Sequence, residues 1–135
     1  MTALSITAAN VLAGANSTRD NGIAGAAVTA GQPVYKAADN SYKLADTNDA
    51  SALVRKPKGI ALHAAAIGQP LAVHQKGPLT IGASVTPGVA YYLGGTPGTI
   101  VPVGDLTTGD HPALIGMATS ATDIYVDIQT PDAAL

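Results

Sequence analysis

The sequence predicts a mainly β protein: a small β-barrel or β-sandwich-like domain built of short strands and hairpins, with at most one short helix. Three observations predict this class. The 15 glycines and 9 prolines are spread along the chain and divide it into short apolar runs. Several of these runs alternate apolar and polar residues, which is the period of a strand. Glutamate is absent and lysine is scarce, although both normally populate exposed helix faces.

The clearest strand covers residues 123–129, near the C-terminus. Its aliphatic residues alternate with Asp123, Tyr125 and Asp127, so one face is apolar and the other is polar. Residues 114–118 form another apolar run. Gly116 inside that run favours a strand or a bulge over a helix.

Two strands are expected at residues 59–64 and 71–75. Gly68 and Pro70 mark a turn between them, so the two strands pair or lie as near neighbours. A further short strand follows at residues 79–81 and is ended by the next glycine.

Two segments share one layout, which predicts two β-hairpins. Residues 29–36 and 86–93 each place a Thr-x-Gly turn before a tyrosine-bearing strand. A turn-rich stretch follows each of them, and an apolar strand then resumes at residues 42–44 or 99–103. A weak internal duplication and a repeated use of the same turn chemistry both explain the likeness.

One segment favours a short helix. Aspartate and asparagine at residues 46–49 resemble an N-cap before the alanine-containing run at 50–55. The helix would have one or two turns, because Pro57 closes it.

The first twenty residues differ in composition from the rest. Leu4, Ile6, Val11 and Leu12 stand among Ala, Asn, Ser and Thr, which is too apolar for disorder and too thin for a core segment. An extended arm that packs on a neighbouring molecule and an edge strand of the same domain fit equally well. We assign residues 1–20 to the arm and 21–135 to one β-rich domain, since domains commonly run ~100–150 residues.

Composition argues against several functional classes. The chain has no cysteine, a formal net charge of −2 and no apolar run near the ~20 residues of a membrane span. Neither nucleic-acid binding through a basic face nor membrane insertion is therefore expected, and the N-terminus lacks the basic region of a signal peptide. Charged residues make up 12%, about half the usual share. Such a neutral surface suits a protein that is covered by partners, although an Ala/Thr/Gly-rich β domain has it too.

The search for catalytic groups predicts a protein that is not an enzyme and holds no cofactor or metal. His63 and His74 lie on adjacent predicted strands, but no third ligand accompanies them. His111 follows Asp110, and neighbours on a strand point to opposite faces. All three histidines are expected at solvent-facing strand positions. The glycine-rich residues 94–98 lack the Lys-Ser/Thr ending of a phosphate loop and indicate a hairpin turn.

The only basic cluster is formed by Arg55, Lys56 and Lys58. A solvated loop explains it, and so does contact with phosphates or with an acidic protein partner. Together with Leu4, Ile6, Val11 and Leu12, these three residues are the candidate interface residues.

Residues 59–73, Gly-Ile-Ala-Leu-His-Ala-Ala-Ala-Ile-Gly-Gln-Pro-Leu-Ala-Val, resemble a signature of small tailed-bacteriophage head proteins that serve as capsid decoration, or cement, proteins. Further pieces match in order at 30–35, 42–46, 77–83, 88–93 and 115–121. The resemblance implies a small β domain that docks on the outside of the expanded capsid. It also implies the major capsid protein as partner, assembly as a homotrimer, and synthesis in the host cytoplasm before incorporation into the virion.

Two other functions compete with capsid decoration. A head-fibre base or tail protein that binds a host surface glycan would need exposed aromatic platforms, for which Tyr91 and Tyr92 are the candidates. A small hydrolase or lyase would need a pocket that joins a histidine to an aspartate, for which only His111 and Asp110 offer a pair.

Overall fold

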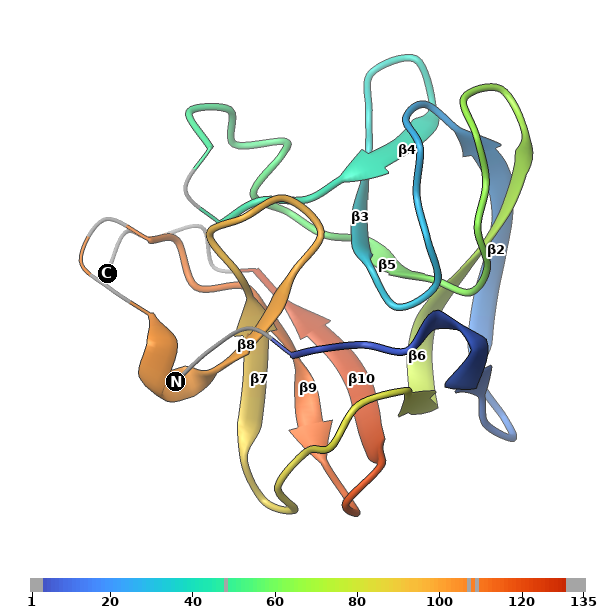
Figure 1. Ribbon diagram of the computed structural model, residues 1–135. Coiled ribbons are helices and arrows are strands. Elements are labelled where there is room, and N and C mark those ends of the chain that lie inside the picture. The colour runs from blue at the N-terminus through green and yellow to red at the C-terminus, as the bar shows by residue number, and fades with distance from the viewer. Residues whose placement is uncertain (1–3, 48, 107, 109, 131–135) are drawn as a thin grey trace.

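A computed structural model describes residues 4–47, 49–106, 108 and 110–130, and these form a mainly β fold (Figure 1). The predicted fold class is confirmed. Within the described residues, ten strands and two single-turn 3-10 helices follow one another along the chain. They are η1 (Ala8–Asn10), β1 (Val11–Ala13), β2 (Thr18–Ala24), β3 (Pro33–Lys36), β4 (Ser41–Leu44), β5 (Gly59–Ala61), β6 (Pro70–Ile81), β7 (Ala90–Leu93), β8 (Ile100–Pro102), η2 (Val103–Asp105), β9 (Leu114–Ala118) and β10 (Asp123–Gln129).

Five strands pair into a closed ring in the order β2, β4, β3, β5, β6 and back to β2. Every pairing is antiparallel except that of β2 with β4, which is parallel and only two residue pairs long. Ala and Val side chains dominate the small core inside the ring of strands, together with Leu71 and the aromatic side chain of Tyr42. Closure of the ring leaves fewer free edges than an open sheet of the same strands would have.

The second half of β6 leaves the ring and continues the same sheet in the order β6, β10, β9, β7, β8, a part that we call the second sheet. The inward residues of these strands form the larger core, which includes Leu79, Ile81, Ile115, Ile124 and Val126. The alternation predicted for residues 123–129 accounts for this, because Ile124 and Val126 are fully buried while Tyr125 between them is exposed. The strand β6 is thus a wall of both cores.

The described part of the N-terminal segment packs on its own chain. The Leu4 N–H donates to the Ile100 carbonyl at 2.8 Å, and the Thr7 N–H donates to the Gly82 carbonyl at 2.8 Å. Figure 1 shows this segment crossing from β8 to β6, where β1 pairs with residues 79–81. The alternative of an edge strand in the same domain therefore describes residues 11–13. The outer ends of the assigned ranges, 1–3 and 131–135, lie outside the described residues.

Both predicted hairpins are present, formed by β3 with β4 and by β7 with β8. The strands predicted at 71–75 and 79–81 are one continuous strand, β6. Pro78 is tolerated inside β6 although proline has no backbone N–H. The Pro78 carbonyl accepts the Gly14 N–H at 2.8 Å, so this side of Pro78, where the N–H is missing, faces the irregular link between β1 and β2. The strand predicted at 59–64 ends earlier, at Ala61.

The helix predicted over residues 50–55 does not form. The Asp49 carboxylate accepts the Ser51 N–H at 2.8 Å, and the Lys56 N–H donates to the Leu53 carbonyl at 3.2 Å. These contacts make successive turns and bends rather than a helix. The aspartate therefore caps a turn, because its short side chain bonds to the backbone two residues on.

Candidate functional site

The three histidines occupy different environments. His63 is exposed, accepting the Ala72 N–H at Nε2 and lying 2.9 Å from the Ala64 carbonyl through Nδ1. This agrees with the expected solvent-facing position and ties the β5–β6 connection together. His111 is partly buried. His74 is fully buried, which contradicts the expectation that all three face solvent.

His74 is held as a neutral imidazole inside the fold. Its Nε2 lies 2.9 Å from the Gly77 carbonyl, which can only accept, so Nε2 carries the hydrogen. Its Nδ1 is buried and has no hydrogen-bond partner within the described residues. Burial lowers the pKa of His74; the bond to Gly77 raises it, and the charge of Arg19, opposite on β2, lowers it further.

Unfolding is expected to become easier as the pH falls below ~6.5, the pKa of a histidine in an unfolded chain. The unfolded chain then binds a proton that folded His74, with its lowered pKa, does not bind. The free energy of unfolding should therefore decrease with falling pH, by at most about 1.4 kcal/mol per pH unit for this one site. The stabilisation is complete above that pH. Urea unfolding midpoints between about pH 5 and 7, above the titration of ordinary carboxyls, measure the effect.

The matched test compares His74→Gln with His63→Gln. Glutamine at 74 removes the titration and keeps an amide that can donate to Gly77, so the slope of stability against pH should flatten in this window. Glutamine at exposed position 63 keeps His74, so the part of the slope that His74 causes should remain in this variant. Equal slopes in the wild type and the His74 variant would show that His74 does not cause the dependence.

His111 lies in the segment before β9 and is held by contacts with Thr47. The His111 N–H donates to the Thr47 carbonyl at 3.0 Å, and the Thr47 hydroxyl donates to the His111 carbonyl at 2.6 Å. These two contacts join the segment before β9 to the end of the β3–β4 hairpin. In the described ranges, no three His, Cys, Asp or Glu side chains are grouped so as to hold a metal ion.

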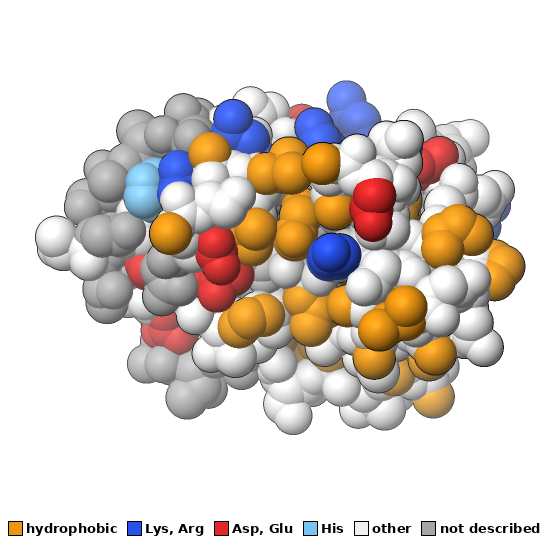
Figure 2. All heavy atoms as spheres, turned by 90° about the horizontal axis from the view of Figure 1, so that it is seen from above, with side chains coloured by type: hydrophobic (Ala, Val, Ile, Leu, Met, Phe, Trp, Pro, Cys, Tyr) orange, Lys and Arg blue, Asp and Glu red, His pale blue; other side chains and the backbone are white. Residues whose placement is uncertain are grey.

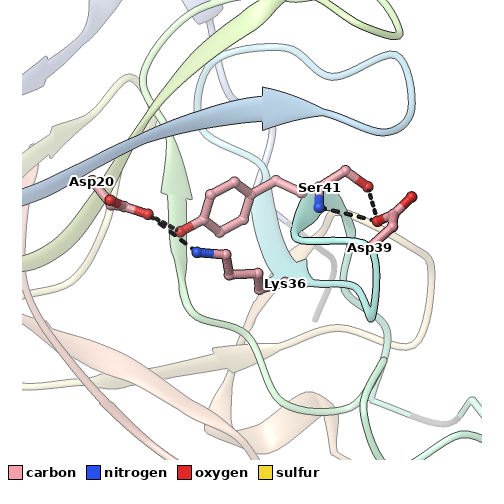
Figure 3. Close-up of polar contacts among 5 residues, drawn as sticks. Asp20, Lys36, Asp39 and Ser41 are labelled. Atoms are coloured by element: carbon pink, nitrogen blue, oxygen red, sulfur yellow. Dashed lines mark hydrogen bonds and ion pairs between the residues drawn. The ribbon is translucent and has the colours of Figure 1, made fainter.

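A polar cluster connects strands of the five-stranded ring (Figure 3). The Tyr42 hydroxyl donates to Asp20 at 2.5 Å, and Lys36 Nζ lies 3.9 Å from the same carboxylate. Burial raises the pKa of Tyr42 and the neighbouring Asp20 raises it further, so the phenol stays protonated and cannot act as a base. The cluster joins β2, β3 and β4 where the short parallel pairing closes the ring, and we assign it a structural role.

Large exposed apolar side chains gather on the outer face of the second sheet. Pro78 on β6 lies opposite Tyr125 on β10, which lies opposite Met117 on β9, which lies opposite Ala90 on β7. Residues directly opposite in antiparallel strands share a face, so these four side chains form one row. Tyr125 is 43% exposed and Met117 is 52% exposed. We call this row, together with Leu12, the sheet face.

Leu12 belongs to the same face one row away. It lies opposite Thr80, which lies opposite Asp123. Leu12 is 64% exposed, so its side chain is available for contact. Beside it, a groove of about 590 Å³ runs between the N-terminal segment and the end of β6, lined by polar residues such as Ser5, Thr7, Asn10 and Ser84. The groove contains no aromatic side chain on which a sugar could stack.

A second apolar surface lies at one end of the ring. Ile23 and Ile67 border a groove of about 430 Å³ there, together with Asp39, Ser41 and Lys43. Ile67 is among the most exposed apolar residues, at 74%. Figure 2 shows the molecule from above relative to the view of Figure 1. Hydrophobic side chains are spread over the face that includes this end, with charged groups between them. We call Ile23, Ile67 and their groove the ring end.

The predicted interface residues are divided by the structure. Val11 is buried, and Leu4 and Ile6 are partly buried and pack against the larger core. Leu12 remains a candidate. Lys58 is exposed, whereas Arg55 and Lys56 are partly buried. Tyr91 and Tyr92, the candidate platform of the glycan-binding alternative, are not both exposed, because Tyr91 is buried and its hydroxyl accepts the Thr86 N–H at 3.0 Å.

Sequence reasoning missed Met117, Pro78, Ala90, Ile23 and Ile67 as surface residues. The signal available for the sheet face was the alternation of residues 123–129, which predicts an outward Tyr125. The strand register that places Met117 beside it could not be seen in the sequence.

Comparison of the chain with known proteins gives no family. No protein-family model matches it, and a search of curated proteins finds no significant match. No helix in the described part of the chain has the length and apolarity needed to cross a membrane.

Proposed function

We propose that this chain is a non-enzymatic structural virion protein that binds the outside of the expanded phage capsid and stabilises it. Its partners would be the major capsid protein and further copies of itself in a homotrimer, after synthesis in the host cytoplasm. Support comes from the ordered resemblance to decoration proteins and from the mainly β fold.

The observation that carries the proposal is the sheet face, with its exposed tyrosine and methionine in one row. Tyrosine is enriched among the residues that dominate binding energy, and methionine adapts to irregular partner surfaces. The ring end provides a separate apolar surface built from β2 and the turn before β6. A molecule with two such surfaces can contact two neighbours at once, and weak contacts repeated by symmetry add up through avidity.

The test is co-sedimentation of the purified protein with empty shells of its phage, in the expanded and unexpanded states. Saturable binding to expanded shells alone, in a ratio that matches icosahedral axes, is the expected result. Sedimentation velocity of the free protein checks the trimer. Absence of binding to both kinds of shell would overturn the proposal and direct the search to tail structures and host glycans.

A further inference from the structure

We propose that the sheet face docks onto a protein surface that has an apolar centre and a rim of Lys or Arg side chains. This inference rests on the proposed function, because it describes the part of the expanded shell that the chain would contact. It adds which face of the molecule is turned inward and the chemistry of the partner.

The centre of the face sets the apolar part of the partner. Tyr125 and Met117 stand directly opposite each other on neighbouring strands, and Pro78 and Ala90 extend the row on either side. These side chains come from four paired strands whose inner residues are buried, so the row is held on a rigid support. Tyrosine and methionine give contact area with few charges to desolvate.

The charges around this centre are mainly acidic. Asp123 and Asp127 flank Tyr125 at two-residue spacing on the same strand, which places them on the same face. Asp123 is fixed there, since its Oδ1 accepts the hydroxyls of Thr80 at 2.9 Å and Thr122 at 3.1 Å. Lys76 lies opposite Asp127 at one border, and no lysine or arginine occurs after it in the sequence. A complementary surface is therefore basic at its rim.

The same charges argue against a second copy on this face. In a two-fold contact the same patch meets itself. Each molecule would then bring its own Asp123 and Asp127 to the same apolar centre. The cation at the border of this centre would be Lys76 of each molecule. Like charges placed across an interface oppose association. A different protein with basic residues around an apolar patch avoids this cost.

Peroxide footprinting of Met117 tests the orientation directly. Hydrogen peroxide transfers one oxygen atom to the thioether sulfur, which becomes a sulfoxide, and water is released. Met117 is one of two methionines in the chain, the other being Met1. In the free protein the exposed Met117 should oxidise readily. On expanded shells its rate should fall by about tenfold or more, read by mass spectrometry of the peptide that contains it.

Charge variants test the basic rim. The double variant Asp123→Asn with Asp127→Asn should bind expanded shells about tenfold more weakly at about 50 mM NaCl, and the difference should shrink severalfold at about 500 mM, where charges are screened. His63→Gln is the matched control, because His63 is exposed and belongs to neither the sheet face nor the ring end, and it should leave both the affinity and the Met117 protection unchanged.

The outcomes separate the two proposals. Binding of the wild type with Met117 unprotected, or with no weakening in the charge variant, overturns the sheet-face inference and leaves capsid decoration standing. If Met117 is protected but binding to expanded shells does not depend on salt, the sheet face is the docking surface and the basic rim of the partner is overturned. Failure of the wild type to bind either kind of shell overturns the proposed function and this partner together.

Discussion

Replacing Gly116 by alanine is expected to lower the free energy of unfolding by about 2–4 kcal/mol. A Cβ at this position would overlap the carbonyl oxygen of Tyr125 on the neighbouring strand and press on Ile124. The oxygen belongs to the backbone and cannot rotate away, so β9 and β10 would have to separate where they hold Met117 beside Tyr125. Urea unfolding followed by circular dichroism measures the loss.

Gly68→Ala separates this steric effect from backbone conformation. Gly68 has a φ of +86°, and a Cβ added there would meet no atom within 4 Å other than those of its chain neighbours. The cost of alanine at this position is therefore only the strained backbone conformation. The expected loss is about 1 kcal/mol, the usual cost of an L-residue in the left-handed region. Equal losses for the two alanine variants would contradict the steric explanation for Gly116.

The second large effect concerns the N-terminal segment. The double variant Leu4→Ser with Ile6→Ser is expected to lose about 2–4 kcal/mol of stability, because both side chains pack against the larger core and serine would remove most of that contact. The main-chain bond from Leu4 to Ile100 would also weaken as the segment loosens. The same urea titration measures this loss.

Leu12→Ser is the control for this pair, since Leu12 lies in the same segment but is 64% exposed. Its expected effect on stability is within about 0.5 kcal/mol. A detachable arm would show a different pattern, because the Leu4 and Ile6 variant would then keep its stability and lose only its association with other molecules. That pattern would support the arm interpretation.

The parts of the fold that depend on local pattern could be predicted. The bounds of β10 follow from strict alternation over residues 123–129, and both hairpins follow from turn residues placed before tyrosine-bearing strands. Local chemistry was less decisive at Asp49, where the same side chain suits a helix cap and a turn. The turn formed because the following residues make contacts of their own with the loop backbone.

Features that arise from long-range pairing could not be predicted. Closure of the ring depends on β2 meeting both β4 and β6, and nothing in residues 18–24 alone specifies either partner. His74 is buried on β6 where this strand pairs with β2 on one side and β5 on the other, whereas its polar type suggests an exposed position. The sheet face required the registers of four strand pairs, so only Tyr125, from the alternation of its strand, and Leu12, as an interface candidate, could be anticipated.

The strand β6 contributes residues to both cores of the molecule and so connects them. Leu71 and Val73 belong to the core of the ring, while Leu79 and Ile81 on the same strand belong to the larger core. Neither half can open without removing a wall of the other, so the two cores should melt in one cooperative step. A stretching force applied to the second sheet would be transmitted along β6 to the ring of strands, so the molecule would resist stretching as one mechanical unit.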